Sequence, residues 1–282
     1  MFLADFGLDS LIERSLAEDL SDGDPTTDLL LASDLKGEAT IVARDSGVLS
    51  GIDFALKVFQ RLDSTLNLNR LIEDGSNISS GNSLAQIDGL LASILKAERT
   101  AINIVQHLSG IATLTRSYVE AVEGYEVSIL DTRKTTAGLR HMEKHAVRSG
   151  GGNNHRFNLG DSILVKDNHI KALKGVGLGM GDIVRKALIQ ANGAYEVEVE
   201  VESISEFKEA LDAGAKRILL DNMSIDETRE CVCISNGIAL LEASGGITLS
   251  NVRDVASTGV DYISVGSLTH SSTSLDIGLD LF

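Results

Sequence analysis

The sequence has 282 residues, of which 43% are apolar and 23% charged, as is typical of a globular protein with ample surface to bury. Its formal net charge of -16 argues against a general nucleic-acid-binding protein, because phosphate contacts need clustered Lys and Arg. No apolar run approaches the roughly 18–20 residues needed to cross a bilayer. The first residues also lack the basic segment of a secretory signal peptide. We therefore expect a cytoplasmic protein that binds neither nucleic acid nor a membrane.

The N-terminal part of the sequence combines helical and strand patterns and is expected to form an α+β region. The longest helical pattern contains Gly110, which we expect to break or kink the helix. The expected helices cover residues 8–20, 52–62 and 90–122, and the expected strands cover residues 38–44, 47–51 and 83–87. No motif in this part carries obvious chemistry.

From residue 126 onward, strand and helix patterns alternate, which favours βα units and a parallel sheet. The six expected strands cover residues 126–130, 162–166, 197–201, 217–220, 238–242 and 261–265. Ser203-x-x-Glu206 and Ser224-x-x-Glu227 are capping-box openings that directly follow strands. We expect an incomplete, about six-stranded parallel α/β barrel, with an open flavodoxin-like sheet as the alternative.

Two short patterns in this part are interpreted as structural features and not as binding or metal sites. The glycine-rich run 175–181 follows no strand directly and has the spacing G-x-G-x-G-x-G, so it is interpreted as a flexible connection or lid and not as a dinucleotide fingerprint. Cys231 and Cys233 are separated by one residue, which suits neither a zinc knuckle nor a typical disulfide. We expect two reduced, buried thiols on a helix.

Polar or glycine-rich residues follow five of the six strands, at the end where parallel α/β folds bind ligands. These residues are 131–134, 166–169, 221–222, 244–246 and 266–267, the last followed by Thr269 and His270. Within the window 131–171, Lys and Arg outnumber Asp and Glu, although the whole chain is acidic. The glycines after the last two strands suit a phosphate group, because they leave backbone N–H groups accessible. The sequence therefore predicts a site for a polyanionic, phosphorylated substrate.

One expected strand has the sequence EVEVEVE, with glutamates at 196, 198, 200 and 202. Alternate residues of a strand share a face, so the valines are expected to face the helices and the glutamates the barrel interior. Buried carboxylates need cationic or hydrogen-bonding partners. We expect basic residues of the first two barrel strands to supply them.

At these motifs the sequence resembles the quinolinate phosphoribosyltransferases, also called nicotinate-nucleotide pyrophosphorylases (carboxylating). The matching segments follow one another along nearly the whole chain: DGDPTTDLL (22–30), ERTAINIVQHLSGIAT (98–113), DTRKTTAGLRHMEKHAVRSGGGNNHR (131–156), LVKDNHI (164–170), EVEVES (198–203), LLDN (219–222), EASGGIT (242–248) and VDYISVGSLTHS (260–271). The resemblance implies an N-terminal α+β domain over 1–112, an incomplete barrel over 113–270 and a C-terminal segment, 271–282, that returns to the first domain. It also implies a homodimer, with higher assembly in some members.

The family reaction implied by the resemblance joins quinolinate to phosphoribosyl pyrophosphate (PRPP) and gives nicotinate mononucleotide, pyrophosphate and CO2, in NAD biosynthesis. The residues that match the family's quinolinate-binding set are Thr132, Arg133, Lys134, His155, Arg156 and Lys166, with Arg99 reaching the site of the neighbouring subunit. Bidentate pairing of Arg with carboxylates suits this dicarboxylate substrate.

The resemblance also implies a site for the phosphoribosyl group and for Mg2+. Glu200 and Asp221 match carboxylates near the ribose hydroxyls and the metal ion, and with Lys134 and Lys166 they are the expected catalytic residues. The expected phosphate-binding residues are Ser244, Gly245, Gly246, Val265, Gly266, Ser267 and His270. Two alternatives remain open: a phosphoribosyltransferase that does not decarboxylate, and a non-enzymatic anion-binding relative associated with molybdate transport.

Overall fold

The computed structural model describes residues 7–282 and contains two compact units, which are described separately. The first unit consists of the chain up to Arg116 together with Thr135–Gly151 and Thr269–Phe282. The second consists of Ser117–Lys134 and Gly152–Leu268. The expectation about a signal peptide concerns mainly residues 1–6, which lie outside the described residues. Within 7–282, no helix combines the length and the apolar character needed to cross a membrane.

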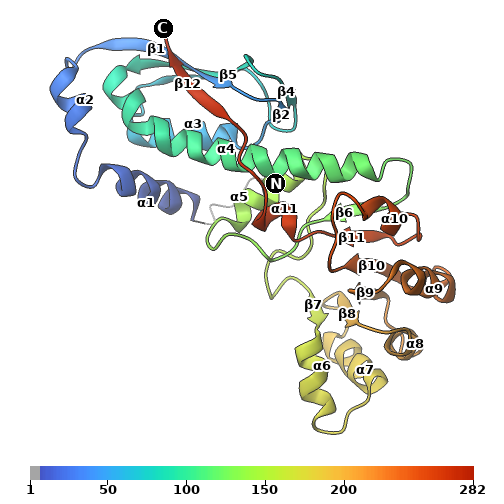
Figure 1. The fold of residues 1–282 in the computed structure, drawn as a ribbon. Coiled ribbons are helices and arrows are strands. Elements are labelled where there is room, and N and C mark those ends of the chain that lie inside the picture. The colour runs from blue at the N-terminus through green and yellow to red at the C-terminus, as the bar shows by residue number, and fades with distance from the viewer. Residues whose placement is uncertain (1–6) are drawn as a thin grey trace. The chain divides into compact units, whose positions relative to one another are not determined.

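The first unit is an α+β structure built on a four-stranded antiparallel sheet in the order β12-β1-β5-β3. The last strand, β12, pairs with β1, with Ala39 opposite Leu281, and the red and blue strands lie side by side in Figure 1. The elements that begin in this unit are α1 (Leu8–Leu20), α2 (Pro25–Leu30), β1 (Lys36–Ala43), β2 (Gly47–Val48), α3 (Ile52–Leu62), β3 (Asn67–Arg70), β4 (Asn77–Ile78), β5 (Ser83–Leu90), α4 (Leu91–Ala121), α5 (Arg140–Ser149) and β12 (Ile277–Leu281).

Amphipathic patterns explain most of these elements. Helix α3 buries Ile52, Phe54 and Phe59 on one side, and the last five residues of β1 are buried. The two helices expected at 8–20 and 52–62 are confirmed to the residue. The strand expected at 47–51 is shorter, and it pairs with β4 and not with β1.

The expected interruption of the long helix is wrong, because α4 is continuous through Gly110. A Cβ atom at this position would lie 2.1 Å from the carbonyl oxygen of Thr273. Gly110 therefore allows the segment before β12 to approach the helix closely, which explains its presence within a helix that it does not end.

The second unit is the incomplete parallel α/β barrel expected from the sequence. Its six strands have the order β6-β11-β10-β9-β8-β7, so consecutive strands from β7 to β11 are neighbours, and β6 lies beside the last one, β11. This order fits a barrel opened between β6 and β7 and excludes the flavodoxin-like alternative. The elements are β6 (Ser128–Leu130), β7 (Ile163–Val165), α6 (Asp167–Lys174), α7 (Met180–Ala191), β8 (Val197–Val201), α8 (Ile204–Asp212), β9 (Arg217–Asp221), α9 (Ile225–Ser235), β10 (Leu240–Ser244), α10 (Val252–Ala256), β11 (Tyr262–Ser264) and the short α11 (Ser267–His270) at the unit's limit.

Local sequence signals account for the starts of two barrel helices. Ser224 and Glu227 form the expected capping box at the start of α9. At α8, Ser203 accepts a hydrogen bond from the Glu206 N–H as expected, but the Glu206 carboxylate binds the N–H of Glu202. The expectation of two buried thiols is half wrong, because Cys231 is buried in α9 and Cys233 is exposed two residues later on the same helix.

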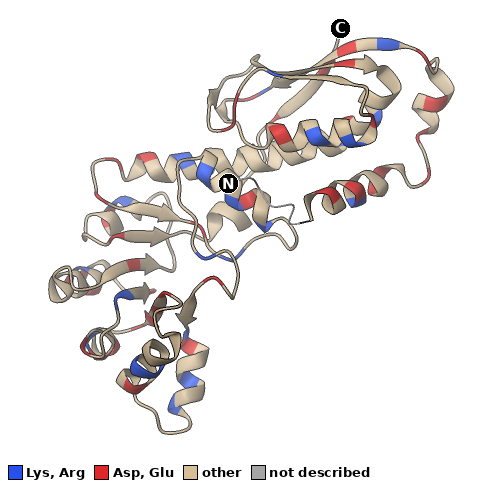
Figure 2. Ribbon diagram, turned by 180° about the vertical axis from the view of Figure 1, so that it is seen from behind, with Lys and Arg blue, Asp and Glu red and all other residues tan. Residues whose placement is uncertain are grey.

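Alternation along the barrel strands separates an apolar outer layer from a polar interior. In β8, Val197, Val199 and Val201 are buried, and in β9 and β10 the residues of matching parity are also apolar. Residues of the opposite parity, such as Glu200 and Asp221, face the interior and line a cavity there. Asp and Glu are otherwise distributed over both units, as the red segments in Figure 2 show. The barrel fold therefore brings together side chains that are widely separated in the sequence.

Candidate active site

A cavity of about 380 Å³ lies at the carboxyl ends of the barrel strands, entirely within the second unit. Nine of its lining residues are among those predicted from the sequence: Thr132, Arg133, Lys134, His155, Arg156, Lys166, Glu200, Asp221 and Ser244. Four further residues complete the lining: Leu164, Leu219, Glu242 and Ser264. The cavity therefore has cationic, anionic and apolar walls, which suits a ligand that contains all three kinds of group.

The cationic wall is formed by residues after β6, before β7 and at the end of β7. The Lys134 N–H donates to Thr132 Oγ1 at 3.0 Å, which closes a tight turn after β6. Arg156 Nη1 donates to the carbonyl oxygen of Ser162 at 3.1 Å. Burial and the nearby charge of Arg133 lower the pKa of Arg156 from its usual value. These cations repel one another, and a bound anion would relieve that repulsion.

The segment that carries His155 lies beside β6, on the side where the barrel is open. Asn153 forms a parallel bridge with Leu130. The carboxylate of Asp131, whose side chain is fully buried, accepts a hydrogen bond from Asn154 Nδ2 at 2.6 Å and one from the His155 N–H at 2.9 Å. Asp131 therefore ties the end of β6 to the segment that supplies His155 and its neighbour.

The anionic wall contains Glu200 from β8 and Asp221 from β9, which are adjacent strands. Burial raises the pKa of Glu200, and the negative charge of Asp221 raises it further against the opposing effect of Lys166. Two half-buried carboxylates that repel each other in this way are the kind of oxygen ligands that bind Mg2+. The residues present therefore fit a divalent cation.

The glycine loop after β10 packs tightly against the end of β9. A Cβ atom at Gly245, whose φ is +91°, would lie 2.2 Å from Asn222 Oδ1, and the Asn222 N–H donates to the carbonyl oxygen of Ser244. Close packing against Asn222 therefore requires glycine here. Other residues predicted to bind phosphate are outside the cavity lining, and their role stays a prediction: Gly245, Gly246, Val265, Gly266 and Ser267.

The buried glutamate of β8 has different partners from those expected. Glu198 Oε1 accepts from Arg217 Nε at 3.0 Å, and Glu198 Oε2 lies 2.9 Å from His155 Nε2. For Glu198, the expectation that the first two strands supply the cation is wrong, because Arg217 is directly opposite Glu198 on β9 and shares its face. For Glu200, the charge of Lys166, from the second expected strand, acts on the carboxylate as expected. Of the four glutamates, Glu196 and Glu202 are exposed, so the barrel encloses only the central pair.

Glu242 on β10 is a second buried carboxylate that the sequence analysis did not identify. Its Oε2 accepts from Arg217 Nη2 at 2.7 Å, and its Oε1 lies 3.4 Å from His155 Nε2. The sequence analysis missed Arg217 as well. The alternation of inward and outward residues already used for β8 could have identified Arg217 and Glu242, because both occupy inward positions of their strands.

Models of protein families match almost the whole chain. The model for the quinolinate phosphoribosyl transferase N-terminal domain matches residues 24–109, and the model for the C-terminal domain matches residues 111–280. The chain belongs to the quinolinate phosphoribosyltransferase family.

Individual members of the quinolinate phosphoribosyltransferase family are similar to this chain over nearly the whole of both sequences. A nicotinate-nucleotide pyrophosphorylase (carboxylating) of Mycobacterium leprae is 43% identical over 96% of this chain and 95% of its own. A probable enzyme of the same name from Bacillus subtilis is 40% identical over 97% and 93% of the two chains. The solved structure of the Francisella tularensis nicotinate-nucleotide pyrophosphorylase has a TM-score of 0.93 at 37% identity, covering 100% of this chain and 98% of the other.

More distant structures share only the fold with this family member. A human nicotinic acid phosphoribosyltransferase is 13% identical, with a TM-score of 0.61 over 99% of this chain and 74% of its own. The fold therefore does not separate the two kinds of phosphoribosyltransferase, and the side chains of the cavity must do so.

Two residues predicted from the family resemblance belong to the first unit and not to the unit that contains the cavity. Arg99 lies on α4, and His270 ends α11. His270 Nδ1 lies 2.7 Å from Ser271 Oγ. Their assignment to substrate binding stays a prediction.

Proposed function

We propose that this chain transfers the phosphoribosyl group of PRPP to quinolinate and decarboxylates the product, giving nicotinate mononucleotide, pyrophosphate and CO2 in NAD biosynthesis. This is the activity of a nicotinate-nucleotide diphosphorylase (carboxylating), EC 2.4.2.19. The observation that carries the proposal is the single cavity in which Arg133, Arg156 and Lys166 face Glu200 and Asp221.

The cationic wall suits the two adjacent carboxylates of quinolinate. A guanidinium group can bind a carboxylate through two parallel hydrogen bonds, which fixes the orientation of the substrate as well as its position. Leu164 and Leu219 supply apolar surface for the pyridine ring in the same cavity. Lys134 and Lys166 add positive charge that balances the dicarboxylate beside the phosphoribosyl donor.

The anionic wall suits the ribose and a metal ion. Glu200 and Asp221 would hold Mg2+, directly or through water, and the ion would neutralise charge on the pyrophosphate that leaves. As the bond from ribose C1 to pyrophosphate breaks, positive charge develops at C1, and the two carboxylates stabilise it. Ser244 and the glycine loops after β10 and β11, with Val265, Ser267 and His270, would bind the 5′-phosphate.

The pyridine nitrogen then forms the new bond to C1. The resulting pyridinium ring accepts the electron pair of the bond to the 2-carboxylate, CO2 leaves, and the carbon takes a proton from water. The side chains therefore act mainly by holding the two substrates in line and by stabilising charge.

We also infer that the chain acts as a homodimer in the cytoplasm, with Arg99 reaching the cavity of the partner subunit. The family resemblance supports the dimer, and the two cysteines without a disulfide are consistent with a reducing compartment. Size-exclusion chromatography with light scattering tests the dimer. Mixing an Arg99→Ala variant with a variant that is inactive through its own cavity tests the shared site, because hybrid dimers should regain activity.

The decisive experiment measures release of labelled CO2 from carboxyl-labelled quinolinate. Release should require both PRPP and Mg2+ and should be matched by formation of nicotinate mononucleotide. Nicotinate as the sole acceptor should give little product, and molybdate should not bind at micromolar concentrations. Turnover of nicotinate without CO2 release, or tight molybdate binding without turnover, would replace this proposal by one of its two alternatives.

A further inference from the structure

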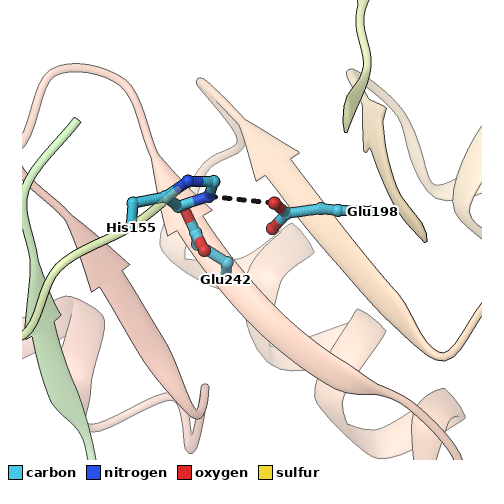
Figure 3. Close-up of side chains that lie close together, drawn as sticks. All are labelled: His155, Glu198 and Glu242. Carbon is cyan, nitrogen blue, oxygen red and sulfur yellow. Dashed lines mark hydrogen bonds and ion pairs between the residues drawn. The ribbon is translucent and has the colours of Figure 1, made fainter. Parts of the chain in front are cut away.

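Two basic residues of the cavity, His155 and Lys166, are held in different ways. The imidazole of His155 lies 2.9 Å from Glu198 and 3.4 Å from Glu242, and Figure 3 shows both carboxylates converging on the ring. The charge of Lys166 acts on Glu200, but among the described residues no carboxylate lies within ion-pair distance of its ammonium group. A lysine side chain is long and flexible, so the place of its charge depends on the backbone that carries it.

The backbone of Lys166 forms the junction between β7 and α6. The strand ends at Val165, the helix begins at Asp167, and Lys166 is the N-cap residue between them, with φ -98° and ψ 166°. Lysine is unfavourable at an N-cap, because its side chain has no acceptor for the N–H groups of the first turn. Its charge also lies at the positive end of the helix dipole. Another residue must therefore stabilise this junction.

His169 supplies a hydrogen bond at the junction. Its Nδ1 lies 3.0 Å from the backbone nitrogen of Lys166, and because a backbone N–H can only donate, Nδ1 is the acceptor. His169 is three residues after the N-cap, the place from which a Glu or Gln side chain reaches back in a capping box. In this arrangement Nδ1 carries no proton, and the proton of the neutral ring is on Nε2.

The same turn connects the cationic and anionic walls of the cavity. The Asp167 N–H points at Glu200 Oε1 at 3.5 Å, a long contact. The Asp167 carboxylate pairs with Lys171 Nζ at 2.8 Å, one turn further along α6. Lys166 and Glu200 both line the cavity. The turn therefore fixes the backbone of Lys166 beside Glu200 and leaves its ammonium group available to a ligand.

We propose that His169 is a positioning residue, which fixes the backbone of Lys166 at the start of α6 and so places the Lys166 ammonium group in the cavity for the anionic substrates. His169 is absent from the cavity lining, so it acts through Lys166 and not by touching a substrate. The inference rests on the proposed function for the role of Lys166 itself.

Replacement of His169 by Ala in the full-length enzyme removes the acceptor. Because His169 is exposed, the variant should fold. A misplacement of about 1 Å can cost about 10²-fold in rate, and a loosened backbone should cost less, so kcat/KM for quinolinate should fall about tenfold. His169→Gln should return kcat/KM to within about threefold of wild type, because Gln is a usual residue at this place in a capping box. A His169→Gln variant as impaired as His169→Ala would contradict the proposal.

Glu227→Ala is the matched control for the loss of a capping bond. Glu227 Oε2 accepts the Ser224 N–H at 2.9 Å in the capping box of α9, and neither residue lines the cavity. His169→Ala and Glu227→Ala should lower the midpoint of urea unfolding by similar amounts, whereas only His169→Ala should lower kcat/KM. An equal loss of kcat/KM in both variants would overturn the positioning role, since activity would then merely follow stability.

A double-mutant cycle shows whether His169 acts through Lys166. Lys166→Ala alone should lower kcat/KM by about 10²–10³, as expected for the loss of a charged group of the site. Adding His169→Ala to this variant should change kcat/KM by less than about twofold, because the side chain that His169 places is already missing. A tenfold loss in both backgrounds would show that His169 acts independently of Lys166 and would overturn the inference.

An NMR measurement on the free enzyme separates this inference from the proposed function. In protein labelled with 15N at histidine, the His169 signals are assigned by their loss in His169→Gln. Their shifts at the pH of the assay should show a protonated Nε2 and an unprotonated, hydrogen-bonded Nδ1, and a proton on Nδ1 would overturn the proposal. Failure of the wild-type enzyme to use quinolinate would instead overturn the proposed function, and the shifts would still decide whether His169 binds the Lys166 N–H.

Discussion

Replacement of Asp131 by Ala should destabilise the barrel strongly. The carboxylate is fully buried and accepts hydrogen bonds from Asn154 Nδ2 at 2.6 Å and from the His155 N–H at 2.9 Å. A hydrogen bond to a charged group contributes about 1.5–3 kcal/mol, so the loss of these two should lower the free energy of unfolding by about 3–6 kcal/mol. Alanine also leaves two part-buried donors without this acceptor, which adds to the cost of the substitution.

Urea unfolding followed by far-ultraviolet circular dichroism measures this change. Asp226→Ala is the control, because the Asp226 side chain is 95% exposed and its ion pair with Arg229 should contribute less than about 1 kcal/mol. Asn154→Ala removes one of the two donors and should fall between the control and Asp131→Ala. A loss below about 1 kcal/mol in Asp131→Ala would refute the argument that this carboxylate ties β6 to the His155 segment.

Three further predictions follow from the charges of the cavity. Arg133→Ala and Lys134→Ala should each lower kcat/KM for quinolinate by about 10²–10³ or more, as measured by CO2 release, and activity within about threefold of wild type would reject their assignment. The pKa of His155 is raised to about 9 from an ordinary 6.5, so its contribution to stability is complete below pH 6.5 and is lost as the pH rises through 9. Urea unfolding should therefore show a loss on the order of 3 kcal/mol between pH 6 and pH 10 that is absent in His155→Gln. Chelation of divalent cations should abolish turnover and added Mg2+ should restore it, whereas Asp221→Asn should raise the Mg2+ concentration needed for half-maximal rate at least several-fold; an unchanged requirement would exclude Asp221 as a ligand.

Most helices and strands of the fold could be predicted from the sequence, because each depends on a local pattern. The six barrel strands were predicted within about two residues of their observed limits, since buried apolar runs and the turns after them define parallel strands. Gly110 was misread because the close approach of Thr273 comes from a distant part of the chain. Likewise, the pairing of β2 with β4 depends on tertiary structure that the local pattern does not contain.

The sequence analysis identified the site residues at the strand ends but missed Arg217 and Glu242, which lie earlier in their strands. Arg133, Lys166 and Asp221 end a strand or follow one within three residues, and parallel strands bring their ends together, so their convergence follows from fold class alone. Arg217 and Glu242 lie within or at the start of strands, where a lone charged residue usually indicates an edge or an exposed face. The register places Arg217 directly opposite Glu198, whereas Glu242 is opposite Leu219 and reaches Arg217 from two residues further along β10 than Leu240, the residue opposite Arg217.

The antiparallel pairing of β1 with β12 makes the first unit discontinuous along the chain. Arg44 and Asp280 form an ion pair although 236 residues separate them in sequence, and most of the barrel lies between. Contacts of such high sequence separation form slowly, because the intervening chain must be closed into a loop before they are gained. Synthesis from the N-terminus would therefore leave the β1 edge uncovered until the whole barrel has been made. During that interval β1 is open to mispairing with strands of other chains, and the order in which the two units fold becomes a determinant of yield.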